Sequence, residues 1–146
     1  MKGRFDSATR HQISQLWDRF NDLAGDLPGL VDTGAYGICL PPETAEGAFD
    51  YYAAVAVTET ADLPDGISAI DVPAQHYAVF THKLDGPNVT ESLWPTIQYI
   101  WENWLPRSAY EYSGGPDFEF YDGRFAVDGA AGPRGEFDIY IPVRPA

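Results

Sequence analysis

Ile13-Ser-Gln-Leu-Trp-Asp-Arg-Phe20 has apolar residues at helical spacing, and it recurs 84 positions later as Ile97-Gln-Tyr-Ile-Trp-Glu-Asn-Trp104. A second block, Phe49-Asp-Tyr-Tyr-Ala-Ala-Val55, recurs 88 positions later as Phe137-Asp-Ile-Tyr-Ile-Pro-Val143. Two blocks in the same order, with nearly the same offset, indicate an internal repeat. The repeat predicts an α+β fold of two pseudo-symmetric βαββ units, which form one antiparallel sheet with both helices on one face.

The secondary structure expected around these blocks follows from periodicity and turn residues. A helix capped by Ser7 or Thr9 is expected to end near Ala24, and a second helix, capped by Thr90 or Ser92, to end at Leu105. The Gly-rich stretch 122–135 is expected to be a loop. The expected strands are Tyr36–Leu40, Tyr51–Thr58, Gln75–Leu84, Asp117–Tyr121 and Phe137–Val143.

Composition fits one globular domain spanning residues 1–146, with half-repeats at about 1–72 and 73–146. Of the 146 residues, 45% are hydrophobic, which argues against disorder. The net charge of −13 should repel nucleic acid and attract cations. Cys39 is the one cysteine, so no intramolecular disulfide is expected, and an inert buried thiol is predicted. No signal peptide or long apolar run is recognisable, which predicts a cytoplasmic protein.

The pentapeptide Asp117-Phe-Glu-Phe-Tyr121 carries the most unusual residue of the expected sheet. Side chains alternate along a strand, so Phe118 and Phe120 point to one face and Glu119 and Tyr121 to the other. A carboxylate among bulky aromatic residues is either solvated on an open face or buried where a cation, a proton or several donors meet it. The second reading predicts a ligand-binding carboxylate at Glu119.

Other chemistry is sparse in the sequence. His76 and His82 are six residues apart on one expected strand, about 20 Å by strand rise, too far to share a metal ion. His11 has no partner at ligand spacing, and no nucleophile, phosphate-binding or zinc-protease motif occurs. We therefore expect no metal site and no cofactor.

The ordered set of motifs resembles the GyrI-like small-molecule-binding domain, which is also the effector-binding domain of AraC-type and MerR-type multidrug-responsive regulators. The resemblance covers residues 7–143. It rests on Tyr77-Ala-Val-Phe80, Ile100-Trp101-x-x-Trp104-Leu105-Pro106, Asp117-Phe-Glu-Phe-Tyr121 and Asp138-Ile-Tyr-Ile-Pro142, with Leu16-Trp17, Tyr36-Gly37 and Phe49-Asp50-Tyr51 in the first half. No helix-turn-helix domain precedes these motifs, so no direct nucleic acid binding is expected.

The resemblance implies a pocket between the two halves, with a Glu on the strand after the second helix reaching into it and aromatic rings holding cationic lipophilic ligands. That Glu corresponds to Glu119. The candidate wall residues are Tyr36, Tyr51, Trp101 and Tyr121. Trp17 and Trp101 also fit plain core packing.

Three functions remain open at this stage. The leading one is a stand-alone binding protein for cationic lipophilic small molecules. The second is a hydrolase of strained-ring compounds, with Glu119 as general base and Tyr36 as acid. The third is a gyrase-directed interaction protein. Binding and hydrolysis would use the same acid and aromatic residues, so the sequence alone does not separate them.

The repeat also predicts an incomplete sheet edge. The counterpart of the Gln75–Leu84 strand falls before Met1, so the first half should lack most or all of its leading strand. An open edge beside Tyr51–Thr58 or Tyr36–Leu40 invites association. We expect either a homodimer that joins two sheets, which is slightly favoured, or a monomer in which Ile67–Val72 takes the vacant place.

Overall fold

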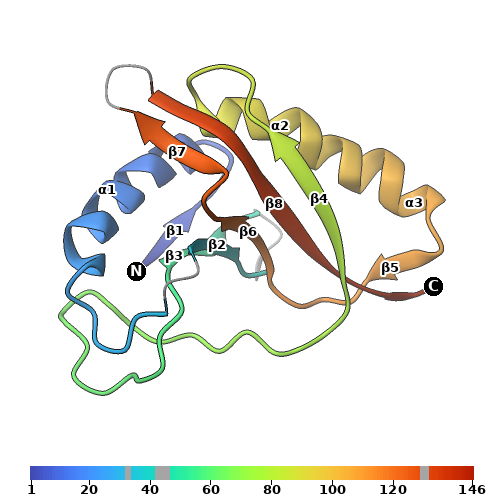
Figure 1. Cartoon of the computed structure of the whole chain (residues 1–146). Coiled ribbons are helices and arrows are strands. Elements are labelled where there is room, and N and C mark those ends of the chain that lie inside the picture. Colours follow the sequence, from blue (N-terminus) through green and yellow to red (C-terminus); the bar gives the residue numbers. More distant parts are fainter. Residues whose placement is uncertain (32–33, 42–46, 129–131) are drawn as a thin grey trace.

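The computed structural model describes residues 1–31, 34–41, 47–128 and 132–146. Two βαββ units follow one another in it, as the repeat predicts (Figure 1). The first unit contains β1 (Lys2–Phe5), α1 (Ile13–Ala24), β2 (Ala35–Cys39) and β3 (Phe49–Ala54), with a short 3-10 turn, η1 (Arg10–Gln12), before α1. The second contains β4 (Tyr77–Lys83), α2 (Val89–Tyr99), β6 (Asp117–Tyr121) and β8 (Gly132–Pro145).

The strands form one antiparallel sheet in the order β1-β3-β2-β6-β8-β4. The two halves therefore meet in the middle of the sheet, where β2 pairs with β6. Two further short strands, β5 (Tyr110–Tyr112) and β7 (Phe125–Asp128), pair with β8 outside this path. The predicted α+β class and pseudo-symmetric architecture are confirmed.

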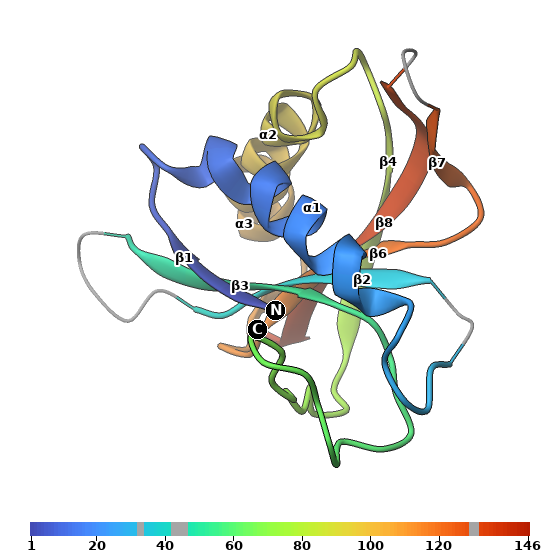
Figure 2. The same ribbon diagram turned by 90° about the vertical axis from the view of Figure 1, so that its left-hand side faces the viewer.

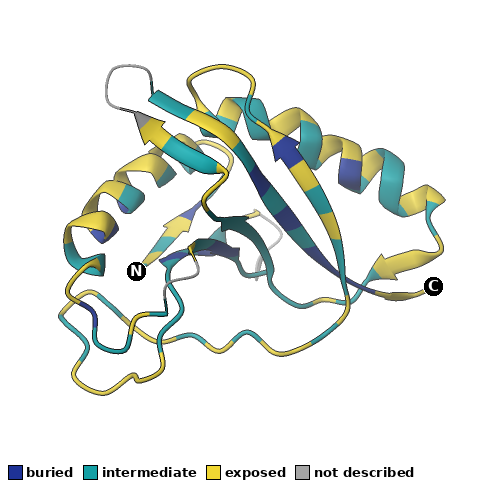
Figure 3. Ribbon diagram, in the orientation of Figure 1, coloured by how far each residue is buried: buried dark blue, intermediate teal, exposed yellow. Residues whose placement is uncertain are grey.

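Both helices pack on the same face of the sheet (Figure 2). Leu16 and Phe20 of α1 are buried with Tyr51 on the first half of the sheet. The second helix runs from α2 through a π-helical turn, η2 (Ile100–Trp104), into α3 (Leu105–Arg107), and Ile100 is buried against Ile139. Each half thus has its own core, and in Figure 3 the longest series of buried residues lies along β8.

The leading strand of the first half is short, as one of the two expectations had it, but it is not missing: β1 has four residues, whereas β4 has seven. Lys2–Phe5 pairs with β3, with Gly3 opposite Tyr51 and Phe5 opposite Phe49. A constant offset along the repeat would place this strand before Met1, but the offset differs between elements. The second helix begins at Val89, about two turns before its repeated block, whereas α1 begins at Ile13, the first residue of that block.

The reason for expecting a homodimer no longer holds, because β1 pairs with β3 at the edge of the sheet that was expected to be open. The alternative is also not adopted. Ile67–Val72 forms no strand, and Ile67 instead packs against the first core.

Two local expectations also change. The stretch 122–135 contains β7, which pairs with the start of β8, and residues 129–131 lie outside the described part. The second helix is capped by Asn88 instead of Thr90 or Ser92. The side-chain oxygen of Asn88 accepts a hydrogen bond from the backbone N–H of Glu91 at 3.0 Å. Among the described residues, no helix is long and apolar enough to cross a membrane.

Candidate ligand-binding site

Glu119 lies at the junction of the two halves, on the face of the sheet that the helices cover. Residues directly opposite one another on paired strands share a face, and Glu119 is opposite Gly37 on β2 and Ile139 on β8. Ile139 is 1% exposed beneath the second helix, which fixes that face as the covered one. The Glu119 side chain therefore points toward the layer of helices.

Gly37 provides the space above the sheet at this point. A Cβ atom on Gly37 would overlap the hydroxyl of Tyr51 and would lie 2.7 Å from Oε2 of Glu119. Both oxygens thus lie over the same glycine. Any other residue at position 37 would push the Tyr51 hydroxyl or the Glu119 carboxyl away.

Aromatic residues from the first half and from β6 surround this point. Trp17 of α1 donates a hydrogen bond from Nε1 to the hydroxyl of Tyr51 at 3.0 Å. The Trp17 ring also meets Tyr121 edge-on, with ring centroids 5.8 Å apart. Tyr51 is 2% exposed, and its contact with Trp17 fixes the position of its hydroxyl beside Glu119.

Two carboxyl groups on this face share an unusual electrostatic environment. Burial, and next the neighbouring Asp117, raise the pKa of Glu119 to about 8. Burial raises the pKa of Asp117, which lies two residues away on the same face of β6, to about 7. The expected rise in the pKa of Glu119 is confirmed, and near neutral pH both groups hold a substantial fraction of protons.

Neither carboxyl has an ion pair or a hydrogen bond to another side chain among the described residues. Both residues are of intermediate exposure, although protein atoms surround their carboxyl groups closely enough to raise both pKa values. No described side-chain oxygen is both sealed from solvent and unpartnered.

The structure brings together Glu119, Tyr51 and Tyr121 and places Tyr36 on the other face of the sheet, whereas the part of Trp101 in the site stays a prediction. Trp101 lies on η2, where it meets Tyr112 edge-on at 5.1 Å and packs against the second core. Tyr36 is opposite Phe120, on the face that the helices do not cover. Tyr36 therefore cannot serve as the acid partner of Glu119 that the hydrolase alternative required.

The outer face holds an aromatic cluster in which Tyr36 takes part. Its ring lies 5.0 Å from that of Phe120 and 5.8 Å from that of Phe118. Phe118 in turn stacks on Tyr140 at 4.6 Å. The prediction that the phenylalanines of β6 point away from Glu119 is confirmed by this arrangement.

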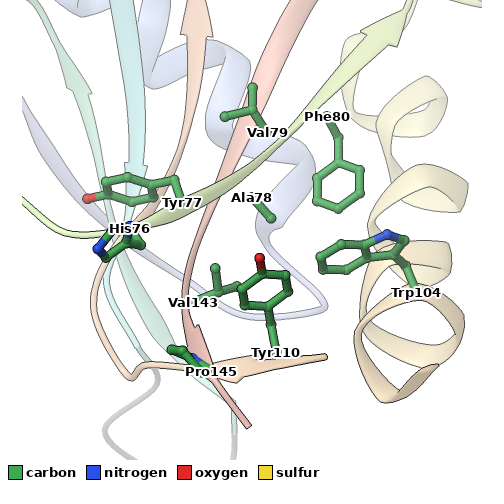
Figure 4. Close-up of a pocket in the computed structure, with 9 residues that line it drawn as sticks. All are labelled: His76, Tyr77, Ala78, Val79, Phe80, Trp104, Tyr110, Val143 and Pro145. Carbon is green, nitrogen blue, oxygen red and sulfur yellow. The ribbon is translucent and has the colours of Figure 1, made fainter. Parts of the chain in front are cut away.

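Two hollows of the surface lie away from Glu119. One, of about 540 Å³, runs beside β4 (Figure 4), and another, of about 230 Å³, lies beneath the segment 63–71. Glu119 lines neither of them. Beside Glu119, the hydroxyl of Tyr51 accepts a hydrogen bond from Trp17, and the Trp17 ring in turn meets Tyr121.

Three residues of this site were not among those predicted. Strand alternation places Asp117 on the face of Glu119, so its role was visible in the sequence. Trp17 fits core packing as well as ligand contact by its sequence, and only its hydrogen bond to Tyr51 places it at the site. Gly37 belongs to one of the motifs of the resemblance, but the sequence did not indicate its contact with Glu119, which depends on the residues opposite and diagonal to it.

A known family covers nearly the whole of this fold. Residues 2–143 match the profile of the Cass2 family, described as integron-associated effector-binding proteins. The chain belongs to this family. Its place there agrees with the resemblance to regulator effector-binding domains.

One curated relative is a longer protein. The transcriptional regulator BrlR of Pseudomonas aeruginosa is 39% identical over 140 residues, which cover 95% of this chain and 49% of BrlR. The chain thus spans about half the length of that regulator.

Solved structures share the fold at low sequence identity. SAV2435, solved bound to tetraphenylphosphonium, superposes with a TM-score of 0.67 at 22% identity, covering 99% of this chain and 86% of that one. The integron cassette protein VCH_CASS2 of Vibrio cholerae superposes with a TM-score of 0.62, also at 22% identity, covering 99% and 87%. These likenesses establish the fold.

Proposed function

We propose that this protein binds cationic lipophilic small molecules at Glu119, in the space between the two helices. The observation that carries the proposal is a carboxyl group that has no cation partner among the described residues, placed over Gly37 and beside Tyr51 and Tyr121. Membership of an effector-binding family supports small-molecule binding in general. The tetraphenylphosphonium in the related fold of SAV2435 supports the choice of a cation.

The physical basis of selectivity is the uncompensated charge. In the empty protein Glu119 is partly protonated, because burial disfavours its charged form. A cation in the site supplies the missing partner, and the attraction is strong because little water screens it. Ring faces nearby add cation–π attraction of about 0.5–2 kcal/mol each.

Binding would require the aromatic side chains to separate. Trp17 and Tyr121 meet edge-on and fill the space that a bulky ligand would occupy. Trp17 is anchored by one hydrogen bond to Tyr51, whose net contribution is about 1 kcal/mol. We therefore expect the Trp17 ring to turn away when a ligand binds. Tryptophan fluorescence would report that movement.

The proposal is tested by replacing the charge while keeping the shape of the side chain. Glu119→Gln should weaken tetraphenylphosphonium by about 1–3 kcal/mol and leave neutral triphenylphosphine oxide nearly unchanged. The free energy of unfolding should hold or rise, because a costly buried acid is removed. Calorimetric titration of both compounds against both proteins measures this.

The matched control is Glu59→Gln, which makes the same change in net charge at an exposed position far along the chain from β6. It should leave both affinities unchanged at physiological salt. Equal weakening of the cation and the neutral compound by Glu119→Gln would make the carboxyl a structural acceptor only, and the proposal would fail.

A further inference from the structure

The hollow beside β4 has an unusual lining. Five consecutive residues, His76–Phe80, line it together with Trp104, Tyr110, Val143 and Pro145. Consecutive strand residues point to opposite faces, so their side chains alone cannot all border one cavity. The cavity therefore runs along the edge of the strand, where the backbone itself forms part of the wall (Figure 4).

The backbone groups at that edge belong to alternate residues. The N–H of Val143 donates to the carbonyl of His76 at 2.9 Å, so the polar groups of His76 and Ala78 face β8. The polar groups of Tyr77 and Val79 then face the other way. Because β4 is the last strand in the order of the sheet, no further strand of the described chain pairs with them.

The opposite wall is aromatic. Trp104 meets Phe80 edge-on, with centroids 4.9 Å apart and planes at 86°. The rings of Trp104 and Tyr110 are nearly parallel, 10° apart, with centroids separated by 6.5 Å. No Asp, Glu, Lys or Arg is among the nine lining residues. Flat apolar walls without a fixed charge favour a planar neutral ligand.

We propose that this cavity is a second small-molecule site, which binds a planar neutral heteroaromatic compound carrying adjacent N–H and C=O groups. In an extended residue, the N–H and C=O point the same way, as they do when one strand residue exchanges two hydrogen bonds with its partner. A lactam edge matches that pattern at Val79. The ring then lies against Trp104 and Tyr110, and the cavity volume of about 540 Å³ suits a ligand of two or three fused rings.

This site is separate from the one at Glu119. Strand β8 lies between β6 and β4, so two strand spacings, about 10 Å, separate the two strands. The proposed ligands also differ in charge. Each site can therefore be tested while the other serves as its control.

The test uses 2-quinolinone, a planar neutral lactam, with 1-methyl-2-quinolinone as a probe that lacks the donor. Amide NMR of the unaltered protein should show shifts at Tyr77 and Val79 on addition of 2-quinolinone. The methylated compound should bind about ten-fold more weakly, because it loses one hydrogen bond and blocks the second. This comparison does not depend on any variant folding.

Two variants assign the aromatic wall. Trp104→Leu should weaken 2-quinolinone about five- to ten-fold through loss of stacking. Trp94→Leu removes a tryptophan that is 42% exposed outside the cavity and should change nothing. Glu119→Gln should leave 2-quinolinone binding intact, whereas Trp104→Leu should leave tetraphenylphosphonium binding intact.

Equal affinity for both quinolinones, or unmoved Tyr77 and Val79 amides, would overturn the proposal. Loss of 2-quinolinone binding in Glu119→Gln would also overturn it, because the two sites would then be one. If an extended peptide moves the β4 amides and 2-quinolinone does not, the edge serves a strand partner instead.

Discussion

At the scale of single residues, the site depends on a residue without a side chain. Glu119 has no ion pair or side-chain hydrogen bond in the described part of the chain. Its side chain can take this position because Gly37 leaves the space above it empty. The hydroxyl of Tyr51 lies in the same space and accepts a hydrogen bond from Trp17. An acid and an aromatic hydroxyl are thereby kept beside one another at the junction of the two halves.

Gly37→Ala should therefore damage the site more than a single methyl group usually would. The new Cβ would overlap the Tyr51 hydroxyl and displace Glu119, at a cost of about 1–3 kcal/mol in unfolding free energy. Gly25→Ala is the control, because a Cβ there meets nothing within 4 Å. Urea unfolding and tetraphenylphosphonium titration measure both effects. Unchanged values in Gly37→Ala would show that the crowding has no consequence.

At the scale of elements, periodicity in the sequence predicts helices and strands, but it does not predict the register in which two strands pair. Periodicity and the repeat predict both helices, five of the strands and their union in one antiparallel sheet, but not which strands pair at the junction of the halves. Alternation places Glu119 and Tyr121 on one face of β6. It cannot place Tyr36 relative to them, because a shift of one residue in the pairing of β2 and β6 would exchange its face.

Strand β1 was missed because its few residues carry little strand signal by themselves. Lys2–Phe5 has two basic residues and a glycine, and its one strong apolar residue is Phe5. Tertiary contacts decide its structure: Phe5 is 7% exposed and meets Tyr51 edge-on at 6.3 Å. Such contacts become visible only when the partner strand is known.

Phe5→Ala tests whether β1 is part of the cooperative fold. Removing this buried ring should lower the free energy of unfolding by about 3–5 kcal/mol. Lys2→Ala is the control on the same strand; its side chain is 51% exposed, and its 3.4 Å ion pair with Asp50 should contribute less than about 1 kcal/mol. Similar losses in the two variants, measured by urea unfolding, would mean that β1 docks only loosely.

At the scale of the whole molecule, a chain of net charge −13 keeps two of its acids partly protonated at the centre of the sheet. The pKa values of Asp117 and Glu119, about 7 and about 8, lie above the ordinary values of 3.8 and 4.5. Between these limits the folded protein holds protons that the unfolded chain has released. Their contribution to the free energy of unfolding must therefore fall as pH rises from about 4 to about 8.

Glu119→Gln should remove the contribution of Glu119 to this loss of unfolding free energy with pH. The variant should therefore gain stability relative to the wild type as pH increases from 5 to 8. A bound cation favours the charged carboxylate. The affinity for tetraphenylphosphonium should therefore rise with pH up to about 8, and binding at pH 6.5 should release protons. Calorimetry in two buffers of different ionisation enthalpy measures that release, and Glu119→Gln should reduce it. Since tetraphenylphosphonium does not titrate, a release of equal size in the variant would mean that another group, with Asp117 foremost, supplies the proton.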